Sequence, residues 1–287
     1  MEASHLNIRE PLANRIYSNL SLPKISIVTI TYNRQEDLKE TFNSVVSQTF
    51  KGYEYIVIDG GSSDGTANFL KEKSSSISQW VSEPDDGIYD AMNKGAKLAS
   101  GEWILFMNAG DSFFSDTTLE EVESYLYSSF DVIFGGVESI YNDKYGYRTL
   151  KSYPRDLSLL WCQIPTCHQS ILVKRELQVK YPFDTELSWC ADHDFLAKLH
   201  SLGHQSKAVP IVISKFEASG DRERNLLVYT EERWSIYKRY FNRTILHDLY
   251  FLNEYRGFWI QQHFHKRLRE HLPKEWVIFL RELRKIY

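Results

Sequence analysis

Short apolar runs alternate with amphipathic stretches along the first hundred residues. Four of these runs are rich in β-branched and aromatic residues, as is typical of strands buried on both faces, and the stretches between them have a helical period. Strands are expected at 25–31, 53–59, 79–82 and 103–107, and helices at about 33–48, 66–73 and 88–99. Strands that alternate with helices predict an open, mostly parallel α/β sheet with helices on its faces.

The alternation becomes less regular after Asp111, which indicates a mixed second half. Helices are expected near 117–127 and 192–200, and strands near 131–140, 147–152, 169–173 and 207–216. From residue 225 onward the pattern is helical and aromatic. We therefore expect an N-terminal extension over 1–23, an α/β domain over 24–220 and a helical C-terminal region over 221–287.

Composition and charge narrow the class of protein. Of the 287 residues, 43% are hydrophobic and 25% are charged, which predicts a folded chain rather than a disordered one. The formal net charge of −4 argues against nucleic acid as a partner. The cysteines have no C-x-x-C spacing, and no stretch approaches the roughly 20 apolar residues that span a bilayer. We expect a soluble or peripheral protein of the cytoplasm.

The C-terminal region differs from the rest of the chain in charge. Residues 222–287 hold 14 Lys and Arg against 8 Asp and Glu, and aromatic residues lie among the basic ones. Such a surface suits peripheral contact with anionic lipid at the inner face of the plasma membrane. The alternative is that the same aromatic side chains pack on the α/β domain or on a second copy in a homodimer.

Polar clusters follow the first four predicted strands. In open α/β sheets ligands bind beyond the carboxyl ends of the strands, so these clusters are the candidate binding residues. They lie at 31–34, 59–64, 83–87 and 108–111. None contains a Walker A or G-x-G-x-x-G pattern, which weakens the ATPase and dinucleotide-oxidoreductase interpretations.

Six motifs in order carry a resemblance to a known family. They are S-I-V-T-I-T-Y-N-R at 26–34, V-I-D-G-G-S-S-D-G-T at 57–66, S-E-P-D-D-G-I-Y-D-A-M-N-K-G at 82–95, G-E-W-I-L-F-M-N-A-G-D at 101–111, H-Q at 168–169 and A-D-H-D-F at 191–195. The chain resembles the family 2 glycosyltransferases of the GT-A fold, especially bacterial enzymes that build capsule, exopolysaccharide or lipopolysaccharide sugars. The resemblance implies an open, mixed, mostly parallel sheet with a Rossmann-like nucleotide-binding half.

The resemblance also implies a nucleotide-sugar site at the ends of the first four strands. Asp59 would accept the imide N–H of uracil, with Thr31 and Tyr32 lining the base and the ribose; the alternative for Asp59 is a turn or capping residue. Capping is the better interpretation for Asp64. Lys94 is the candidate partner of the diphosphate, because a cation offsets the charge of a leaving group. Further donor contacts are expected from Asn33, Asp86, Asn108 and Ala109.

The metal motif departs from the usual pattern of the family. Members commonly carry Asp-x-Asp, whose carboxylates hold Mg²⁺ or Mn²⁺ against the diphosphate. Here the strand ends in Asn108-Ala-Gly-Asp111, so Gly110 stands at the position of the second acid. We expect Mg²⁺ or Mn²⁺ held by Asp111 and His168, with a carbonyl oxygen available from Asn108. The alternative is a strand-end turn in which Asp111 is bonded to the backbone.

Asp192-His193-Asp194 opens a predicted helix. The resemblance implies that Asp192 is the general base that takes the proton of the acceptor hydroxyl. Asp194 is expected to cap the helix or to bind the acceptor, and Gln169 to bind the acceptor. His193 is the rival base because it titrates near neutrality, and both acids would suit a helix N-terminus as capping carboxylates.

These implications add up to inverting glycosyl transfer. The donor would be a nucleotide-diphosphate sugar, expected to be a UDP-sugar, and the acceptor a hydroxyl of a saccharide or of a lipid-linked sugar in surface polysaccharide synthesis. The alternative follows from Gly110: a chain that has lost catalysis and serves as a nucleotide-sugar-binding or scaffolding subunit of a polysaccharide assembly complex. The presence of Asp192 argues against this alternative.

Overall fold

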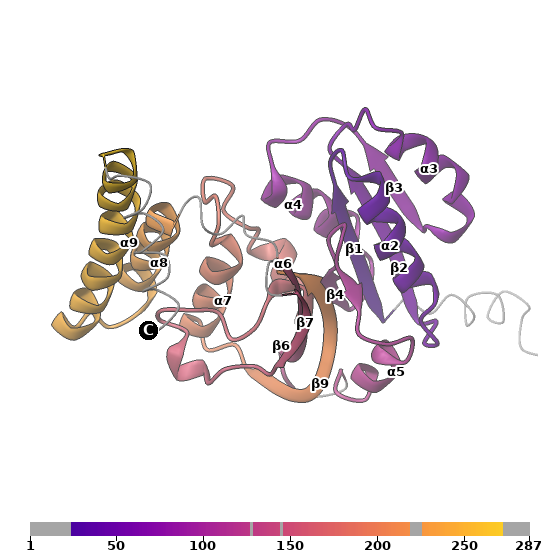
Figure 1. The fold of residues 1–287 in the computed structure, drawn as a ribbon. Coiled ribbons are helices and arrows are strands. Elements are labelled where there is room, and N and C mark those ends of the chain that lie inside the picture. The colour runs from indigo at the N-terminus through magenta and orange to yellow at the C-terminus, as the bar shows by residue number, and fades with distance from the viewer. Residues whose placement is uncertain (1–23, 127–128, 144–145, 219–225, 272–287) are drawn as a thin grey trace, which may run out of the picture.

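The computed structural model describes residues 24–126, 129–143, 146–218 and 226–271. Within these residues nine strands form one sheet in the order β3-β2-β1-β4-β8-β6-β9-β5, with β7 paired to β6 (Figure 1). The strands are β1 Ile25–Thr31, β2 Tyr53–Asp59, β3 Gln79–Ser82, β4 Trp103–Phe106, β5 Ser112–Phe113, β6 Val132–Asp143, β7 Gly146–Ser152, β8 Ile171–Lys174 and β9 Ser206–Glu217. The predicted extension over 1–23 lies outside the described residues.

The sheet changes character at the point where the alternation in the sequence becomes irregular. Strands β3, β2, β1 and β4 pair in parallel. Strand β8 then joins β4 in antiparallel orientation, β6 is antiparallel to β8, and β9 is parallel to β6. The predicted open, mixed α/β sheet with a parallel first half is therefore confirmed.

Helices cover both faces of the sheet. They are α2 Gln35–Val46, α3 Thr66–Glu72, α4 Ile88–Leu98, α5 Thr118–Glu123, α6 Arg175–Lys180 and α7 Ala191–Ser201. Alternate residues of β1 explain the two layers: Ile25 and Ile27 pack with α2, α3 and α5, whereas Val28 and Ile30 pack with α4, α6 and α7. A Cβ atom on Gly95 would lie 2.3 Å from Val28 Cγ1, so this glycine allows α4 to pack directly on β1.

The structure differs from the expected elements in a few short segments. Strand β5 and helix α6 were not predicted, because two residues and six residues are too short to show a period. Short 3₁₀ turns add η1 Ser74–Ser76, η2 Leu157–Leu159 and η3 His168–Ser170, so the strand expected from 169 begins only at Ile171. The helix expected from Asn33 begins at Gln35. Its N-cap residue is Arg34, whose side chain forms no capping hydrogen bond.

Two helices, α8 Leu226–Tyr240 and α9 Ile245–His271, lie side by side at the end of the molecule opposite the first strands (Figure 1). Tyr237 and Phe251 are fully buried and pack with Trp161 and Cys162. Ile236 of α8 is also buried. It packs with Cys190, which directly precedes α7, and with Ala197, which lies in α7. Part of the C-terminal aromatic content therefore packs on the α/β domain, as one of the two alternatives expected.

Candidate functional site

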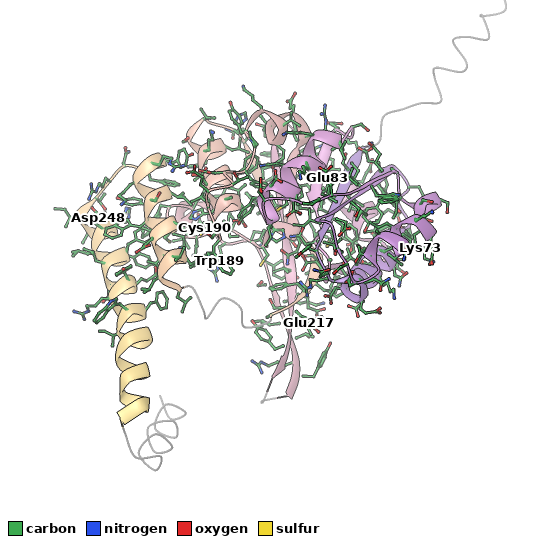
Figure 2. The ribbon with its side chains drawn as sticks, turned by 90° about the horizontal axis from the view of Figure 1, so that it is seen from above. Lys73, Glu83, Trp189, Cys190, Glu217 and Asp248 are labelled. Atoms are coloured by element: carbon green, nitrogen blue, oxygen red, sulfur yellow. The ribbon has the colours of Figure 1, made fainter. Side chains whose placement is uncertain are left out.

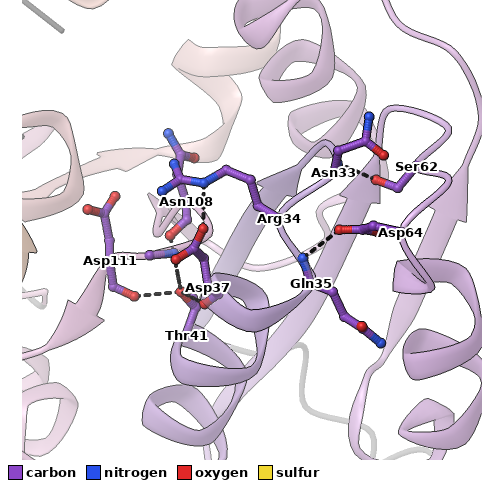
Figure 3. Close-up of polar contacts among 10 residues, drawn as sticks. Asn33, Arg34, Gln35, Asp37, Thr41, Ser62, Asp64, Asn108 and Asp111 are labelled. Atoms are coloured by element: carbon purple, nitrogen blue, oxygen red, sulfur yellow. Dashed lines mark hydrogen bonds and ion pairs between the residues drawn. The ribbon is translucent and has the colours of Figure 1, made fainter.

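The loops after β1 and β2 are tied together at the carboxyl edge of the sheet (Figure 3). Asn33 has a left-handed backbone with φ of 50°, a conformation that Asn tolerates well. Its N–H donates to Ser62 Oγ at 2.7 Å, and its Oδ1 accepts the N–H of Ser63 at 2.8 Å. Asp64 accepts the N–H of Gln35 at 2.9 Å. The capping predicted for Asp64 is confirmed at the start of α3, where the N–H of Thr66 donates to Asp64 Oδ1 at 3.1 Å.

Asp59 is a turn residue of this loop, as the alternative from the sequence expected. Its side chain is fully buried. One oxygen accepts the hydroxyl of Ser62 at 2.5 Å and the other accepts the hydroxyl of Ser82 at 2.6 Å. Because buried carboxylates need such partners, Asp59 holds the loop against β3, and its contact with the base stays a prediction.

A different carboxylate lies on the exposed side of this loop. A Cβ atom on Gly60 would lie 2.5 Å from Asp85 Oδ2 and 3.3 Å from Tyr32 Cδ2, so both side chains lie against the glycine. The Tyr32 side chain is 60% exposed, whereas Thr31 is buried. An exposed ring beside a carboxylate suits a planar base, which stacks on the ring and donates an N–H to the acid.

Lys94 and Asp86 lie on the segment from β3 to α4. Lys94 Nζ lies 3.1 Å from Asp90 Oδ2 and 3.4 Å from Glu83 Oε1, and it donates to the carbonyl of Pro84 at 3.0 Å. Asp86 is exposed, and its N–H donates to Asp90 Oδ2 at 3.2 Å. These contacts hold Lys94 within its own segment, and its contact with the diphosphate stays a prediction.

The turn after β4 is held on α2. Ala109 N–H donates to the carbonyl of Ile30 at 3.1 Å and its side chain lies in the core, so the predicted donor contact of Ala109 is corrected. Thr41 donates to the carbonyl of Asp111 at 2.7 Å and accepts the N–H of Gly110 at 3.0 Å (Figure 3). Gly110 has φ of +98°, a conformation that side-chain-bearing residues rarely adopt, which accounts for glycine at this position.

Replacing Thr41 with Val is expected to lower the free energy of unfolding by about 1–3 kcal/mol, because the carbonyl of Asp111 would lose the Thr41 hydroxyl and the N–H of Gly110 would keep only its 3.3 Å bond to the Asp37 carbonyl. Chemical denaturation measures the effect. Thr49→Val is the matched control, since the Thr49 hydroxyl bonds to Glu120 at an exposed position. Equal stability of the two variants would contradict the role of Thr41 in holding the turn.

Four candidate residues come together between β4 and β8: the predicted metal ligands Asp111 and His168, Asn108, which was expected at the donor, and Gln169, which was expected at the acceptor. Asn108 Nδ2 lies 3.0 Å from His168 Nε2, which in turn lies 4.0 Å from Asp111 Oδ2. Gln169 Nε2 donates to Asp111 Oδ1 at 3.4 Å. Burial raises the pKa of Asp111 to about 7, although a backbone hydrogen bond from Asn108 and the charge of Arg34 lower it. The sheet thus brings together Asp111 and Gln169, which are 58 positions apart in the sequence.

The donor atoms of this cluster fit a hard divalent cation. Asn108 Oδ1 and Gln169 Oε1 are buried and have no hydrogen-bond partner among the described residues. Carboxylate and amide oxygens are the ligands that Mg²⁺ and Mn²⁺ prefer, and imidazole suits Mn²⁺. In the part of the chain that the structure describes, no three His, Cys, Asp or Glu residues are grouped so as to hold a metal. An ion here would therefore need oxygens of the substrate as well.

Asp192 and His168 line the same small apolar recess. The recess is bordered by both residues and by the rings of Phe106, Phe183 and Phe195. Asp192 is half-buried in the first turn of α7, and its Oδ1 accepts the N–H of His193 at 2.8 Å. A helix N-terminus favours the ionised carboxylate, which is the form that a general base requires.

His193 is removed as the rival base. It is buried, and its Nε2 lies 2.6 Å from the carbonyl of Leu160. Burial lowers the pKa of His193 to about 4, so the imidazole is neutral at pH 7 and faces the interior.

The Asp194 carboxylate also has a structural role. One oxygen of its carboxylate accepts Arg239 Nη1 at 2.9 Å, and the other accepts the hydroxyl of Tyr240 at 3.2 Å. Both partners belong to α8. The acceptor contact expected of Asp194 is therefore corrected: this buried acid joins α7 to the C-terminal helices.

The burial of His193 gives a pH-dependent stability. Its pKa is lowered in the folded chain, so the unfolded chain binds the proton first, and stability is lost as the pH falls from 6.5 to about 4. We expect His193→Gln to reduce the slope of unfolding free energy with pH in this window by up to about 1.4 kcal/mol per pH unit. Denaturant titrations of the wild-type protein and of His193→Gln at several pH values isolate the contribution of His193. Equal slopes of unfolding free energy against pH in the two proteins would contradict the prediction.

Comparison with known proteins decides the family. The family model described as Glycosyl transferase family 2 matches residues 26–183, more than half of the chain. The chain belongs to glycosyl transferase family 2. A PGL/p-HBAD biosynthesis glycosyltransferase of Mycobacterium bovis is 30% identical over 183 residues, which cover 61% of this chain and 69% of that protein.

A second relative matches over a shorter stretch. An uncharacterized glycosyltransferase of Mycobacterium tuberculosis is 41% identical over 106 residues. These residues are 36% of this chain and 40% of that protein. The match thus spans less than half the length of this relative.

Solved structures of glycosyltransferases share the fold of this family 2 chain. S. aureus TarS in complex with UDP superposes with a TM-score of 0.58 at 17% identity, covering 88% of this chain and 76% of that one. The mannosyltransferase PcManGT from Pyrobaculum calidifontis, in complex with GDP-Man and Mn²⁺, gives a TM-score of 0.60 at 17% identity, covering 93% and 81%. At this identity the likeness confirms the GT-A fold.

The match to the family 2 model ends before α7, so neither Asp192 nor the C-terminal helices lie within it. Helices α8 and α9 nevertheless pack on α7 and the residues before it. None of the described helices is long and apolar enough to cross a membrane.

Two residues of the candidate clusters, Asp85 in 83–87 and Arg34 in 31–34, were given no role of their own from the sequence. Each lies against a glycine, Asp85 against Gly60 and Arg34 against Gly110. The signal available in the sequence was the glycine itself, because a position without a side chain leaves room for the side chain of a neighbour.

Proposed function

We propose that this family 2 glycosyltransferase moves a sugar from a nucleotide-diphosphate donor to a hydroxyl of a saccharide or lipid-linked acceptor, with inversion at the anomeric carbon. One observation carries the proposal. His168 links the Asp111 cluster and Asp192: its Nε2 lies 4.0 Å from Asp111 Oδ2, and its side chain lines the same recess as Asp192. Family membership supports transfer as the chemistry.

The donor nucleotide is proposed to be UDP. Its base would stack on the exposed Tyr32 ring and donate its imide N–H to Asp85, in the place first assigned to Asp59. TarS binds UDP and PcManGT binds GDP-Man, so both nucleotides belong in the test. Asp86 is exposed nearby, and its contact with the donor stays a prediction.

The chain's own residues divide the reaction between two sides. Asp192 takes the proton of the acceptor hydroxyl as its oxygen forms a bond to the anomeric carbon. The bond from that carbon to the diphosphate breaks, and the nucleoside diphosphate leaves with the electron pair. Asn108, Asp111, His168 and Gln169 would hold Mg²⁺ or Mn²⁺, which when bound neutralises charge on the departing diphosphate. The phenylalanines of the recess exclude water.

The setting that we propose is surface polysaccharide synthesis at the inner face of the plasma membrane. Apolar side chains of α9 support contact with a lipid surface or with a second copy of the chain. The exposed ones include Ile245, Leu246, Leu249, Leu252 and Trp259. An amphipathic helix of this kind would bring the recess close to a lipid-linked acceptor.

A panel of UDP- and GDP-sugars, incubated with Mn²⁺ and the full chain, tests the proposal by the nucleoside diphosphate released. We expect release from at least one donor, increased by a saccharide or lipid-linked acceptor. Nucleotide binding without release from any donor would favour the alternative, a nucleotide-sugar-binding or scaffolding subunit. Gly110 at the position of the usual acid is the observation that keeps this alternative in the test.

A further inference from the structure

The diphosphate side of the proposed site needs a cation from the chain. A nucleoside diphosphate leaves with negative charge, which a positioned Lys or Arg stabilises. Lys94 was the candidate from the sequence. Its ammonium is surrounded by the carboxylates of Asp90 and Glu83 and by the Pro84 carbonyl. A second cation, Arg34, lies at the end of β1 and immediately before α2.

Arg34 is held by one side of its guanidinium only. Its Nε donates to Asp37 Oδ2 at 2.6 Å, which fixes the stem of the side chain (Figure 3). The Arg34 side chain remains 59% exposed. No described residue forms a hydrogen bond with its two terminal nitrogens. Those nitrogens form the fork that binds phosphate oxygens in pairs.

The terminal nitrogens of Arg34 lie against the strand-end turn. Arg34 Nη2 lies 3.5 Å from the point where a Cβ atom of Gly110 would stand. The guanidinium therefore lies beside the position at which the resembling enzymes carry the second acid of Asp-x-Asp. At this edge of the sheet the chain therefore has the positive charge of Arg34 beside the position where those enzymes have a carboxylate. The charge of Arg34 is felt by Asp111, whose pKa it lowers.

We infer that Arg34 binds the diphosphate of the nucleotide-sugar donor through its terminal guanidinium nitrogens and offsets the charge that develops on the leaving group. The inference rests on the proposed function. It names a residue outside the metal cluster and explains how the site tolerates glycine at 110. Asp37 is the positioning residue, since its carboxylate sets the direction of the guanidinium.

Titration calorimetry of Arg34→Gln with UDP and with UMP, in Mn²⁺, tests the inference. A charge-assisted bidentate contact accounts for about a 10- to 100-fold loss of UDP affinity. Because UMP lacks the second phosphate, its affinity should fall by less than about threefold. Arg34→Lys keeps the charge without the fork and should recover part of the UDP affinity. Lys39→Gln is the matched control, because Lys39 is a cation of the adjoining helix α2 that pairs with Glu36.

Three results separate the possible failures. Wild-type protein that binds neither UDP nor GDP overturns the proposed function, and the inference with it. Wild-type protein that binds UDP, with Arg34→Gln unchanged, overturns the inference alone. Equal loss of UDP and UMP affinity in Arg34→Gln, with no recovery in Arg34→Lys, also overturns it, because the residue would then act only on the shape of the β1–α2 loop.

Discussion

Replacing Asp192 with Asn is expected to lower turnover by about 10²- to 10⁴-fold while nucleotide affinity stays within about twofold. The amide keeps the size of the side chain but cannot take a proton from the acceptor hydroxyl. The structure favours this assignment because His193 is buried and neutral and Asp194 is bonded to α8. Released nucleoside diphosphate and calorimetric titration with UDP measure the two quantities.

The matched control for Asp192→Asn is Glu186→Gln, which removes an exposed carboxylate from the loop before α7. It should leave turnover unchanged. Full turnover in Asp192→Asn would exclude Asp192 as the base. Loss of UDP binding together with turnover would instead place Asp192 in the donor site.

Replacing Glu232 with Ala is expected to lower turnover by about 10- to 100-fold with UDP affinity unchanged, because the loop that leads into α7 would shift, and Asp192 lies in the first turn of that helix. The Glu232 carboxylate accepts three consecutive backbone N–H groups, those of Ser188 at 2.7 Å, Trp189 at 3.0 Å and Cys190 at 2.9 Å. Figure 2 shows Trp189 and Cys190 where the C-terminal helices meet the rest of the chain.

Glu232 is thus a positioning residue, and its readout is the separation of turnover from donor affinity. Glu232→Gln retains one acceptor oxygen and should recover part of the turnover. Glu231→Ala is the matched control, since this neighbouring carboxylate is exposed and bonds to Tyr255 of α9. Unchanged turnover in Glu232→Ala would show that α8 does not position Asp192.

The fold was predictable where the sequence is periodic. β1 and β2 begin and end at the expected residues because β-branched runs buried on both faces have no competing interpretation. Strand β5 could not be predicted, since its two residues are ordered only by pairing with β9 more than 100 positions away. The same holds for the packing of α8 on α7, which depends on tertiary contacts of single side chains.

The site was predictable in its clusters and less so in single residues. The motifs placed Asn108, Asp111, His168 and Gln169 in one site, and the structure brings them together. The bonds of Asp59 could not be predicted because nothing local in the sequence shows that the hydroxyls of Ser62 and Ser82 donate to its oxygens. Burial and partner choice are properties of the assembled sheet, so the roles of Lys94 and Asp194 could not be predicted either.

The central claim is that the carboxyl edge of β1 to β4 binds a nucleoside diphosphate with a divalent cation. Calorimetric titration of the full chain with UDP and GDP, each with Mn²⁺ and with EDTA, tests it most directly. We predict that UDP binds, that Mn²⁺ strengthens binding, and that Asp111→Asn loses this strengthening. Absence of binding to either nucleotide, with or without Mn²⁺, would contradict the claim.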